Sequence, residues 1–291
     1  HIIRKPNVAR YRAALQATRA AAMTQDRSPV LVSHLPAITA ATNILRRITC
    51  PEVKQIAFAF NFTNLPTGAH LPYYRWALKG ISVFVVFSKM ERQIYAEAFG
   101  VPLDIIRMMH WAMHPPVPGP ENPVAFDKPY LCAVGGEGRD YALLADVMRT
   151  LPDIKMVIVA RPYSIAGIEF PDNIIVFTNL PAPQTWRLAK DSMGLVVPLK
   201  SATTACGHIT IVGAQLLNIP LVVTRSIGIA DYASEETATL VSPGRASDLS
   251  AAVKAIHTDQ NIIQHRRKCA LKQAQQCNNL DNWVRYFEGL L

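Results

Sequence analysis

A stretch of small residues between an apolar run and a helical pattern could hold a phosphate. Lys200 is followed by Ser-Ala-Thr-Thr-Ala-Cys and then by Gly207-His208, and the apolar run 194–199 precedes it. Small residues let a ligand approach the backbone, and a helix start offers free N–H groups and a partial positive charge. Lys200, the hydroxyl groups and His208 add donors. The pattern predicts a diphosphate site; the alternative is an ordinary helix start capped by one of the two threonines.

A glycine-rich turn forms the second candidate phosphate contact. The predicted strand 130–134 is followed by Gly-Gly-Glu-Gly at 135–138 and then by Arg139. This spacing does not fit the dinucleotide fingerprint Gly-x-Gly-x-x-Gly, and the Gly-Lys-Ser/Thr of a P-loop is absent. A plain tight turn would use the same glycines. Arg139, however, adds a planar fork of donors where a phosphate could lie.

Strands and helices alternate along the whole chain. Apolar runs of strand length occur at 30–32, 55–60, 81–87, 105–109, 130–134, 155–160, 174–177, 194–199, 221–224 and 239–241, with helical patterns between them. Such alternation is typical of parallel sheets covered by helices. In these sheets a ligand lies beyond the carboxyl ends of the strands, and both candidate loops follow a strand.

Five prolines between residues 115 and 123 suggest a domain boundary. Proline at this density excludes a helix or a central strand. We therefore expect an α/β protein with two Rossmann-like, doubly wound domains facing a cleft. The expected parts are an N-terminal domain (1–114) without its first strand, a hinge-like linker (115–123), a C-terminal domain (124–279) and an aromatic docking segment (280–291).

The positive charge of the chain lies in its first part. The 291 residues carry a formal net charge of +9, and residues 1–118, with 14 basic and 5 acidic residues, account for all of it. A basic domain predicts an anionic partner, either an acidic glycan or an anionic membrane surface. Nucleic acid is not expected, because no recognisable module or aromatic-interleaved basic stripe is present. The expected membrane contacts are Arg10, Arg12, Arg19, Arg46, Arg47, Tyr11, Leu15 and Trp76.

Composition excludes several other classes of protein. Half of the residues are hydrophobic and 18% are charged, which excludes extensive disorder, and no apolar run reaches the ~18 residues of a membrane span. The five cysteines are scattered without a Cys-x-x-Cys pair, so we expect no disulfide framework and a reducing, cytoplasmic location. His110 and His114 lack the glutamate of a zincin, so no metal is expected.

The region around the Lys200 loop resembles the donor-binding segment of GT-B glycosyltransferases of family 4. The similar motifs are Gly138-Arg139-Asp140-Tyr141, Gly207-His208-Ile209-Thr210, Gly213 to Thr224, Gly228 to Tyr232, and Leu240 to Gly244 with Asp248-Leu249. The resemblance spans about residues 28–260 and is strongest over 130–260. It implies retaining transfer from a nucleoside-diphosphate sugar to a glycan or lipid-linked acceptor in surface polysaccharide or glycolipid synthesis, without a metal or other cofactor.

The resemblance also implies roles for single residues. Those implied for the donor diphosphate are Gly136, Arg139, Lys200, Gly207, His208, Ile209 and Thr210. Those implied for the nucleotide are Arg161, Thr178, Leu180 and Gly213. His34, which follows a predicted strand, resembles the position where such enzymes place a histidine near the transferred sugar, and is the catalytic candidate.

The sequence departs from the family at two positions. The family usually carries two glutamates eight positions apart, and Ala205 and Gly213 stand there. Neither side chain accepts a hydrogen bond, so recognition of the sugar and the ribose must differ. Two alternatives therefore stay open. One is a non-catalytic GT-B subunit that binds a nucleotide sugar or a partner glycosyltransferase. The other is an epimerase, for which no carboxylate pair can be placed.

Overall fold

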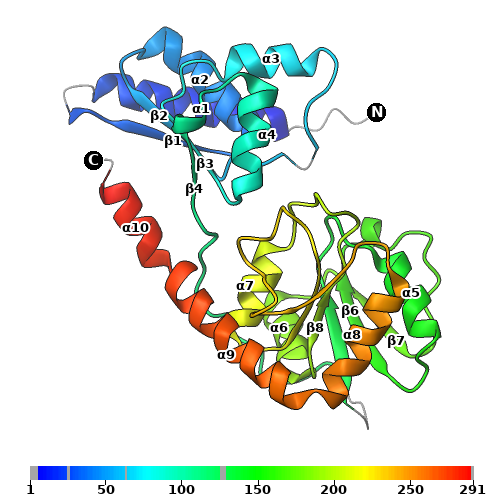
Figure 1. Cartoon of the computed structure of the whole chain (residues 1–291). Helices are drawn as coiled ribbons and strands as arrows, with labels where there is room; N and C mark the ends of the chain where they lie inside the picture. Colours follow the sequence, from blue (N-terminus) through cyan, green and yellow to red (C-terminus); the bar gives the residue numbers. More distant parts are fainter. Residues whose placement is uncertain (1–5, 25–26, 63, 125–128, 290–291) are drawn as a thin grey trace. The chain divides into compact units, whose positions relative to one another are not determined.

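The computed structural model of the chain describes residues 6–24, 27–62, 64–124 and 129–289. They form two compact units, which divide between Met109 and His110. Each unit is built on one sheet of parallel strands with helices packed against it (Figure 1). The expected α/β class with two Rossmann-like domains is therefore confirmed. In this part of the chain, no helix is both long and apolar enough to cross a membrane.

The first unit contains a four-stranded sheet in the order β1-β2-β3-β4. Its strands are β1 (Val30–His34), β2 (Lys54–Phe58), β3 (Val83–Val86) and β4 (Ile106–Met108). Its helices are α1 (Pro6–Met23), α2 (Pro36–Thr49), α3 (His70–Ala77), α4 (Lys89–Phe99) and the 3-10 turn η2 (Leu103–Ile105). β3 is apolar throughout because both faces of a central parallel strand are covered.

Aromatic rings and one buried carboxylate organise the core of the first unit. Phe60 meets Phe84 and Tyr95 edge to face, with ring centroids 5.0 and 5.4 Å apart. Ser88 caps α4 by accepting from the backbone N–H of Glu91 (3.2 Å), and the Glu91 carboxylate accepts from the Ser88 hydroxyl (2.9 Å). Tyr95 also donates to Glu91 (3.1 Å), and burial raises the pKa of Tyr95 well above its ordinary value.

The second unit contains a six-stranded sheet in the order β10-β9-β8-β5-β6-β7. Its strands are β5 (Tyr130–Val134), β6 (Lys155–Ala160), β7 (Ile174–Thr178), β8 (Leu195–Val197), β9 (Leu221–Thr224) and β10 (Thr239–Val241). Its helices are α5 (Tyr141–Arg149), η3 (Pro162–Ser164), α6 (Ala182–Asp191), α7 (His208–Leu216), α8 (Ala246–Thr258), α9 (Gln260–Cys277) and α10 (Leu280–Glu288). The strand order reverses between β5 and β8, which is where such sheets bind ligands.

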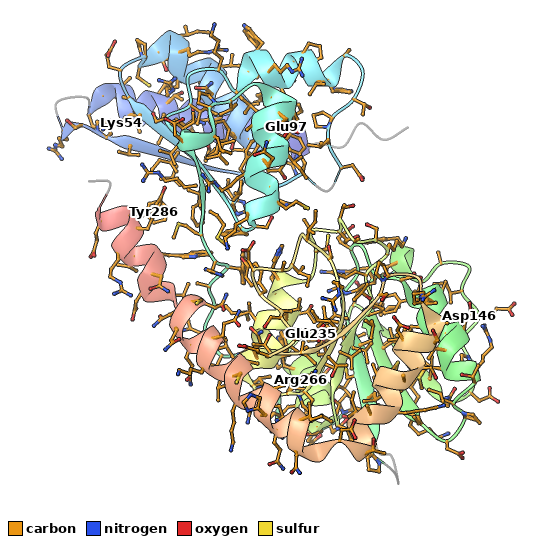
Figure 2. All side chains as sticks on the ribbon, viewed as in Figure 1. Lys54, Glu97, Asp146, Glu235, Arg266 and Tyr286 are labelled. Carbon is orange, nitrogen blue, oxygen red and sulfur yellow. The ribbon has the colours of Figure 1, made fainter. Side chains whose placement is uncertain are left out.

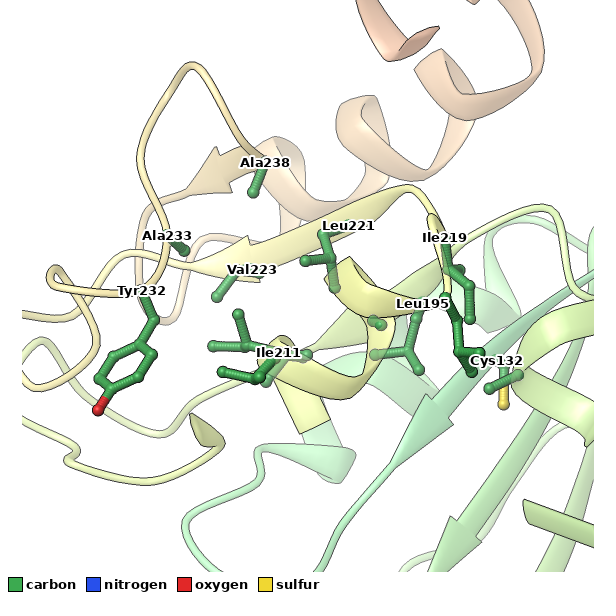
Figure 3. Packing of buried hydrophobic residues seen from close by; sticks show 14 of the residues in the cluster. Cys132, Leu195, Ile211, Ile219, Leu221, Val223, Tyr232, Ala233 and Ala238 are labelled. Atoms are coloured by element: carbon green, nitrogen blue, oxygen red, sulfur yellow. The ribbon is translucent and has the colours of Figure 1, made fainter. Parts of the chain in front are cut away.

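Two hydrophobic clusters cover the two faces of this sheet. Cys132 of β5 points into a cluster with α6 and α7, whereas Leu131 and Ala133 point into a cluster with α5 and α8. Figure 3 shows the first cluster, where Ile211 of α7 lies near Val223 of β9. Because successive strand residues face opposite sides, helices are required on both faces. The second unit is therefore doubly wound.

The proline segment belongs to the second unit. The chain divides at Met109, a few residues before the expected linker 115–123. Within that segment, the Gly119 N–H donates to the Pro183 carbonyl (2.8 Å), and the Asn122 side chain donates to the Tyr130 hydroxyl (2.9 Å). Proline excludes helix and central strand, but it does not prevent an irregular segment from packing against a folded surface.

The C-terminal aromatic segment forms α10 and contacts the start of the second unit. Trp283 meets Trp111 edge to face at 5.6 Å, and its indole N–H donates to the His110 carbonyl (2.9 Å). Before it, α9 is tied to the loop between β9 and β10, because Arg266 donates to the Glu235 carbonyl at 2.9 Å (Figure 2). Residues 290–291 of the expected docking segment lie outside the described residues.

Candidate functional site

The two loops that the sequence singled out lie side by side at the carboxyl edge of the second sheet. One follows β5 and the other follows β8, which are neighbours. Two backbone hydrogen bonds join them, from Lys200 to Gly138 (3.0 Å) and from Asp140 to Pro198 (2.9 Å), and together they form an antiparallel bridge between Arg139 and Leu199. The predicted juxtaposition of the two loops is thus found in the structure.

Arg139 is buried beneath these loops and links them to α7. Its side chain, 4% exposed, donates to the carbonyls of Val134 (3.3 Å) and Glu137 (2.9 Å) and to the Thr210 hydroxyl (3.2 Å). Gly135 makes room for it, since a Cβ there would lie 2.5 Å from Nη2. The sequence pointed to an arginine that reaches out to a ligand; the structure adds a framework role.

Among the residues that the structure describes, no hydrogen bond or ion pair joins Arg139 to a carboxylate. Burial lowers the pKa of the guanidinium, mainly by desolvation, although the nearby Glu137 carboxylate acts on this pKa in the direction opposite to burial. A buried cation that is solvated mainly by carbonyl and hydroxyl dipoles favours an anion nearby.

Helix α7 begins at the same place without a side-chain cap. Its N-cap is Gly207, with φ 107° and no capping hydrogen bond. Neither threonine of the preceding loop caps the helix; the Thr204 hydroxyl instead contacts Ser201 at 2.9 Å. The N–H groups of Ile209 and Thr210 lie in the first turn, where no earlier helical carbonyl can accept from them. The positive end of α7 therefore adds to the field of Arg139.

The imidazole of His208 faces the protein. Its ring lies 4.5 Å from that of Tyr232, edge to face, and Nε2 lies 3.1 Å from the Gly228 carbonyl oxygen. Gly228 supports the loop from behind, since a Cβ there would lie 2.6 Å from the Ala205 Cα. The side chain of His208 thus holds the helix start in place. The predicted contact of His208 with a diphosphate stays a prediction, and with the ring in this orientation the backbone of the first turn would make it.

A pocket of about 290 Å³ opens beside the glycine-rich loop. Its lining includes Gly136, Glu137, Tyr163 and the exposed Lys200. The Tyr163 hydroxyl and the Glu137 carboxylate form a hydrogen bond across one side. Gly136 allows close approach, because a Cβ there would lie 2.6 Å from Arg161 Cγ. Two predicted diphosphate residues with a charge, the buried Arg139 and the exposed Lys200, thus line this hollow.

The predicted nucleotide contacts lie at the ends of β6 and β7. Arg161 follows β6 and donates to the Asn179 side chain at 3.1 Å. Thr178 is exposed at the end of β7, and Leu180 packs half-buried against the first hydrophobic cluster. Thr178 and Leu180 therefore flank Asn179 in the loop after β7, and Arg161 is bonded to the same loop.

Gly213 lies beneath Trp186, which the sequence did not single out. A Cβ at Gly213 would collide with the Trp186 ring, and Gly213 itself is buried in α7. A ligand on this side would meet the half-buried indole before the glycine. The two residues lie on different helices, α6 and α7, so no local pattern reveals the pair.

The catalytic candidate His34 belongs to the first unit. It is the exposed last residue of β1, whereas the preceding Ser33 is buried and donates to the Ile56 carbonyl (3.2 Å). Leu35 follows with φ 66° and ψ 151° and precedes Pro36, the first residue of α2. A leucine with positive φ is rare, and strained residues of this kind cluster at functional sites.

Two further observations concern other possible sites. The described residues contain no group of three or more His, Cys, Asp or Glu side chains placed to hold a metal ion. A hollow of about 350 Å³ lies at the amino ends of β8 and β9, away from the loops. Its cations, Lys190 and Arg267, donate to the carbonyls of Leu217 and Asn218 after α7 (both 2.8 Å). These cations therefore serve the carboxyl end of the helix.

Comparison with solved structures identifies the fold. A glycosyltransferase from Rickettsia africae is 15% identical (95% of this chain, 80% of that chain, TM-score 0.69). Sucrose-phosphate synthase from Thermosynechococcus elongatus is 14% identical (95% and 76%, TM-score 0.71). HepE from Anabaena, solved with UDP-glucose, is 12% identical (96% and 82%, TM-score 0.73). The chain has the GT-B fold.

Comparisons of the sequence alone give no match. No protein-family model matches it, and no curated protein matches it. At identities of 10–15%, the GT-B likeness establishes the fold alone. In this GT-B chain, activity must be argued from the residues of the site.

Proposed function

We propose that this protein is a glycosyltransferase that binds a nucleoside-diphosphate sugar at the carboxyl edge of its second sheet. The observation that carries the proposal is the meeting of the buried Arg139, which makes no hydrogen bond to a carboxylate among the described residues, with the uncapped start of α7. Structures of the same fold support it, since HepE has been solved with UDP-glucose and with UDP. Lys200, exposed at the adjoining pocket, adds a second cation.

The proposed site fits the electrostatic demand of sugar transfer. As the bond between the sugar and the diphosphate breaks, the leaving diphosphate gains negative charge, and fixed donors must meet that charge. Arg139 and the α7 N–H groups are held by the fold, so they need little reorganisation. We therefore propose transfer without a metal ion. His34 is the proposed catalytic side chain near the sugar.

The nucleotide is proposed to lie beside the ends of β6 and β7. Thr178 and Leu180 lie at the loop after β7, and Arg161 is bonded to that loop. The half-buried indole of Trp186 offers an aromatic face. We propose that this face replaces the missing acceptor at Gly213. A base or ribose that packs on an indole gains apolar contact and stacking, but not the hydrogen bonds of a carboxylate.

The finer activity is also a proposal. We propose retaining transfer of a hexose to a glycan or lipid-linked acceptor in surface polysaccharide or glycolipid synthesis. The sequence resemblance supports this, as does the fold shared with WaaB, a lipopolysaccharide outer core galactosyltransferase. Ala205 and Gly213, which stand where the family carries glutamates, favour the alternative of a subunit that binds nucleotide sugar without turnover.

The first unit is proposed to contact an anionic membrane surface. Tyr11 of α1 approaches Tyr73 of α3, and Arg47 of α2 lies 4.7 Å above the ring of Trp76. Tyr11 and Trp76 are each 55% exposed. Exposed aromatic rings next to arginine are suited to a lipid headgroup layer. One expected contact must be removed: Arg46 is buried and donates to the carbonyls of Pro51, Val53 and Gly80.

Calorimetric titration with UDP and UDP-glucose tests the donor site. Lys200→Ala should weaken binding about tenfold, the loss typical of one charged hydrogen bond. Lys254→Ala is the matched control, because Lys254 is an exposed lysine of α8 outside the site. Arg139→Lys should weaken binding further. If the wild-type protein binds no nucleoside diphosphate, or if Lys200→Ala and Lys254→Ala bind equally well, the proposed site is wrong.

Turnover separates the enzyme from the non-catalytic alternative. With UDP-glucose and other nucleotide sugars, release of free nucleoside diphosphate in the presence of acceptor glycans is expected for an enzyme. Tight binding without any release, across the donors that bind, would instead support a binding subunit. His34→Ala should abolish release while leaving UDP affinity unchanged, because His34 is not part of the second unit.

A further inference from the structure

Tyr232 lies between two histidines in the loop that joins β9 to β10. It is fully buried. Its ring centroid is 4.5 Å from that of His208 and 5.5 Å from that of His110, and both contacts are edge to face. His208 is the first residue of α7, whereas His110 is the first residue of the second unit. One ring thus connects the proposed donor site with the segment that follows the first unit. Figure 3 shows Tyr232 in the loop after β9.

Hydrogen bonds fix Tyr232 from several sides. Its hydroxyl accepts from the Trp111 backbone N–H (2.8 Å). Its carbonyl accepts from the side chains of Gln215 on α7 (2.7 Å) and Gln273 on α9 (3.4 Å). Tyr232 therefore touches α7 at both ends, by its ring at His208 and by its carbonyl at Gln215.

The partners of Tyr232 are fixed in turn. The Trp111 carbonyl accepts from the Asn278 side chain (2.6 Å), and the His110 carbonyl accepts from the Trp283 indole (2.9 Å). His110 Nε2 also lies 3.3 Å from the Asp231 carbonyl oxygen. The first residues of the second unit are thus held against the loop that carries Tyr232 and against the helices α9 and α10.

The start of α7 depends on such contacts from outside the helix. Gly207 has no side chain, and no side chain caps the first turn. The side-chain contacts that hold that turn include the hydrogen bond from Arg139 to Thr210 and the contacts of the His208 ring with Tyr232 and with the Gly228 carbonyl. Donors stabilise a developing charge best when the protein has fixed them beforehand.

We propose that Tyr232 is a positioning residue of the donor site. Its ring holds His208, and through it the first-turn N–H groups of α7, in the orientation that a diphosphate requires. Its hydroxyl ties this helix start to Trp111. The proposal rests on the proposed function, because it assigns Tyr232 a role toward the same diphosphate.

The test compares Tyr232→Leu with Tyr232→Phe and a control. Tyr130→Leu is the control, since Tyr130 is also buried in the second unit and its hydroxyl donates to the Leu188 carbonyl (2.8 Å). Tyr232→Leu should weaken UDP binding at least tenfold. Tyr232→Phe keeps the ring and should bind within about threefold of wild type. Tyr130→Leu should lower the melting temperature without weakening binding of UDP by the folded protein.

A readout without ligand separates this proposal from the proposed function. The Ile211 N–H donates to the Gly207 carbonyl (2.8 Å), so its hydrogen exchange reports opening of the α7 start. Exchange at Ile211 should be faster in Tyr232→Leu than in Tyr130→Leu at matched stability. Equal exchange in these two variants overturns the positioning role, even if UDP binds. Absence of UDP binding by the wild type overturns the proposed function, and exchange still decides what Tyr232 does to α7.

A second variant covers the case in which Tyr232→Leu does not fold. His208→Ala leaves Tyr232 in the core and removes only the ring that rests on it. UDP affinity should fall at least fivefold, although the backbone N–H groups of α7 remain. If His208→Ala binds UDP as tightly as the wild type, the ring contact does not position the helix and the proposal is wrong.

Discussion

Leu35 holds a backbone conformation that glycine adopts far more readily. With φ 66° and ψ 151° it lies between the exposed His34 and Pro36. Such a conformation costs roughly 1–3 kcal/mol in a residue with a side chain. The strain turns the chain sharply at the end of β1 and leaves His34 at the sheet edge, which links one unusual residue to the proposed catalytic position.

Replacement of Leu35 by glycine tests whether this strain serves function. Leu35→Gly should leave the free energy of unfolding unchanged or raise it by about 1 kcal/mol, because relief of strain outweighs the entropy cost of glycine. Turnover should fall, since His34 loses its fixed exit from the strand. Leu35→Ala retains the strain and is the control. Equal stability of the two variants, measured by urea unfolding, would contradict the argument.

The Trp186 ring occupies the space that a side chain at position 213 would need. A Cβ at Gly213 would collide with the indole, so Gly213→Ala should reduce the free energy of unfolding by about 1–3 kcal/mol through overpacking. In a Trp186→Ala background the same change should cost almost nothing, and the double-mutant cycle should show strong coupling. Additive effects in urea unfolding would mean that the two residues do not compete for space.

The two ends of helix α7 have different electrostatic surroundings. Its amino end has no side-chain cap and lies beside Arg139, whereas Lys190 and Arg267 donate to the carbonyls that follow its carboxyl end. Cations at a carboxyl end stabilise a helix. An anion at the amino end, where Arg139 lies beside the first-turn N–H groups, would stabilise the helix. The carbonyls that follow the carboxyl end of α7 thus have cationic partners. We propose that the diphosphate is the partner of the first-turn N–H groups at the amino end.

The two ends of α7 should therefore respond differently to substitution. Arg267→Gln should lower the free energy of unfolding by about 0.3–1 kcal/mol and leave UDP affinity within about twofold. Lys200→Ala should lower UDP affinity and leave the free energy of unfolding nearly unchanged, because Lys200 is exposed and contacts the ligand in this proposal. Thermal unfolding and calorimetry on both variants check this. A tenfold loss of UDP affinity in Arg267→Gln would show that the two ends are not independent.

In the whole molecule, the net charge is distributed unequally between the two units. All of the formal +9 belongs to the part of the sequence that forms the first unit and the start of the second. No acidic residue occurs in α1, and Arg10 and Arg12 are exposed on it near Tyr11. This distribution motivates the proposed contact with an anionic membrane surface.

Co-sedimentation with vesicles tests the membrane contact. The protein should sediment with anionic vesicles at low salt, less at high salt, and not with neutral vesicles. The double variant Arg10→Gln/Arg12→Gln should bind at least tenfold more weakly. Lys254→Gln/Lys268→Gln, which removes two exposed charges from the second unit, should bind as the wild type does. A wild-type protein that stays in the supernatant at low salt would favour an acidic glycan as the anionic partner.

The fold class and the two candidate loops could be predicted from local sequence patterns. Apolar runs alternating with helical patterns require parallel sheets, and small residues after the strands at 130–134 and 194–199 mark the loops. These signals are local, since each is carried by residues close together in the chain. The structure accordingly agrees with the predicted sheets and brings the two loops together.

The contacts of the individual side chains could not be predicted from local patterns. Arg139 and Arg46 read as surface cations, yet both are buried, because carbonyl groups from other segments converge on them. The proline segment reads as a linker, yet it is bonded to the second unit. Tyr232 touches His110, 122 residues earlier in the numbering. Such partners are chosen by long-range packing, which depends on shape and on the satisfaction of buried polar groups, and neither is a local property of a sequence.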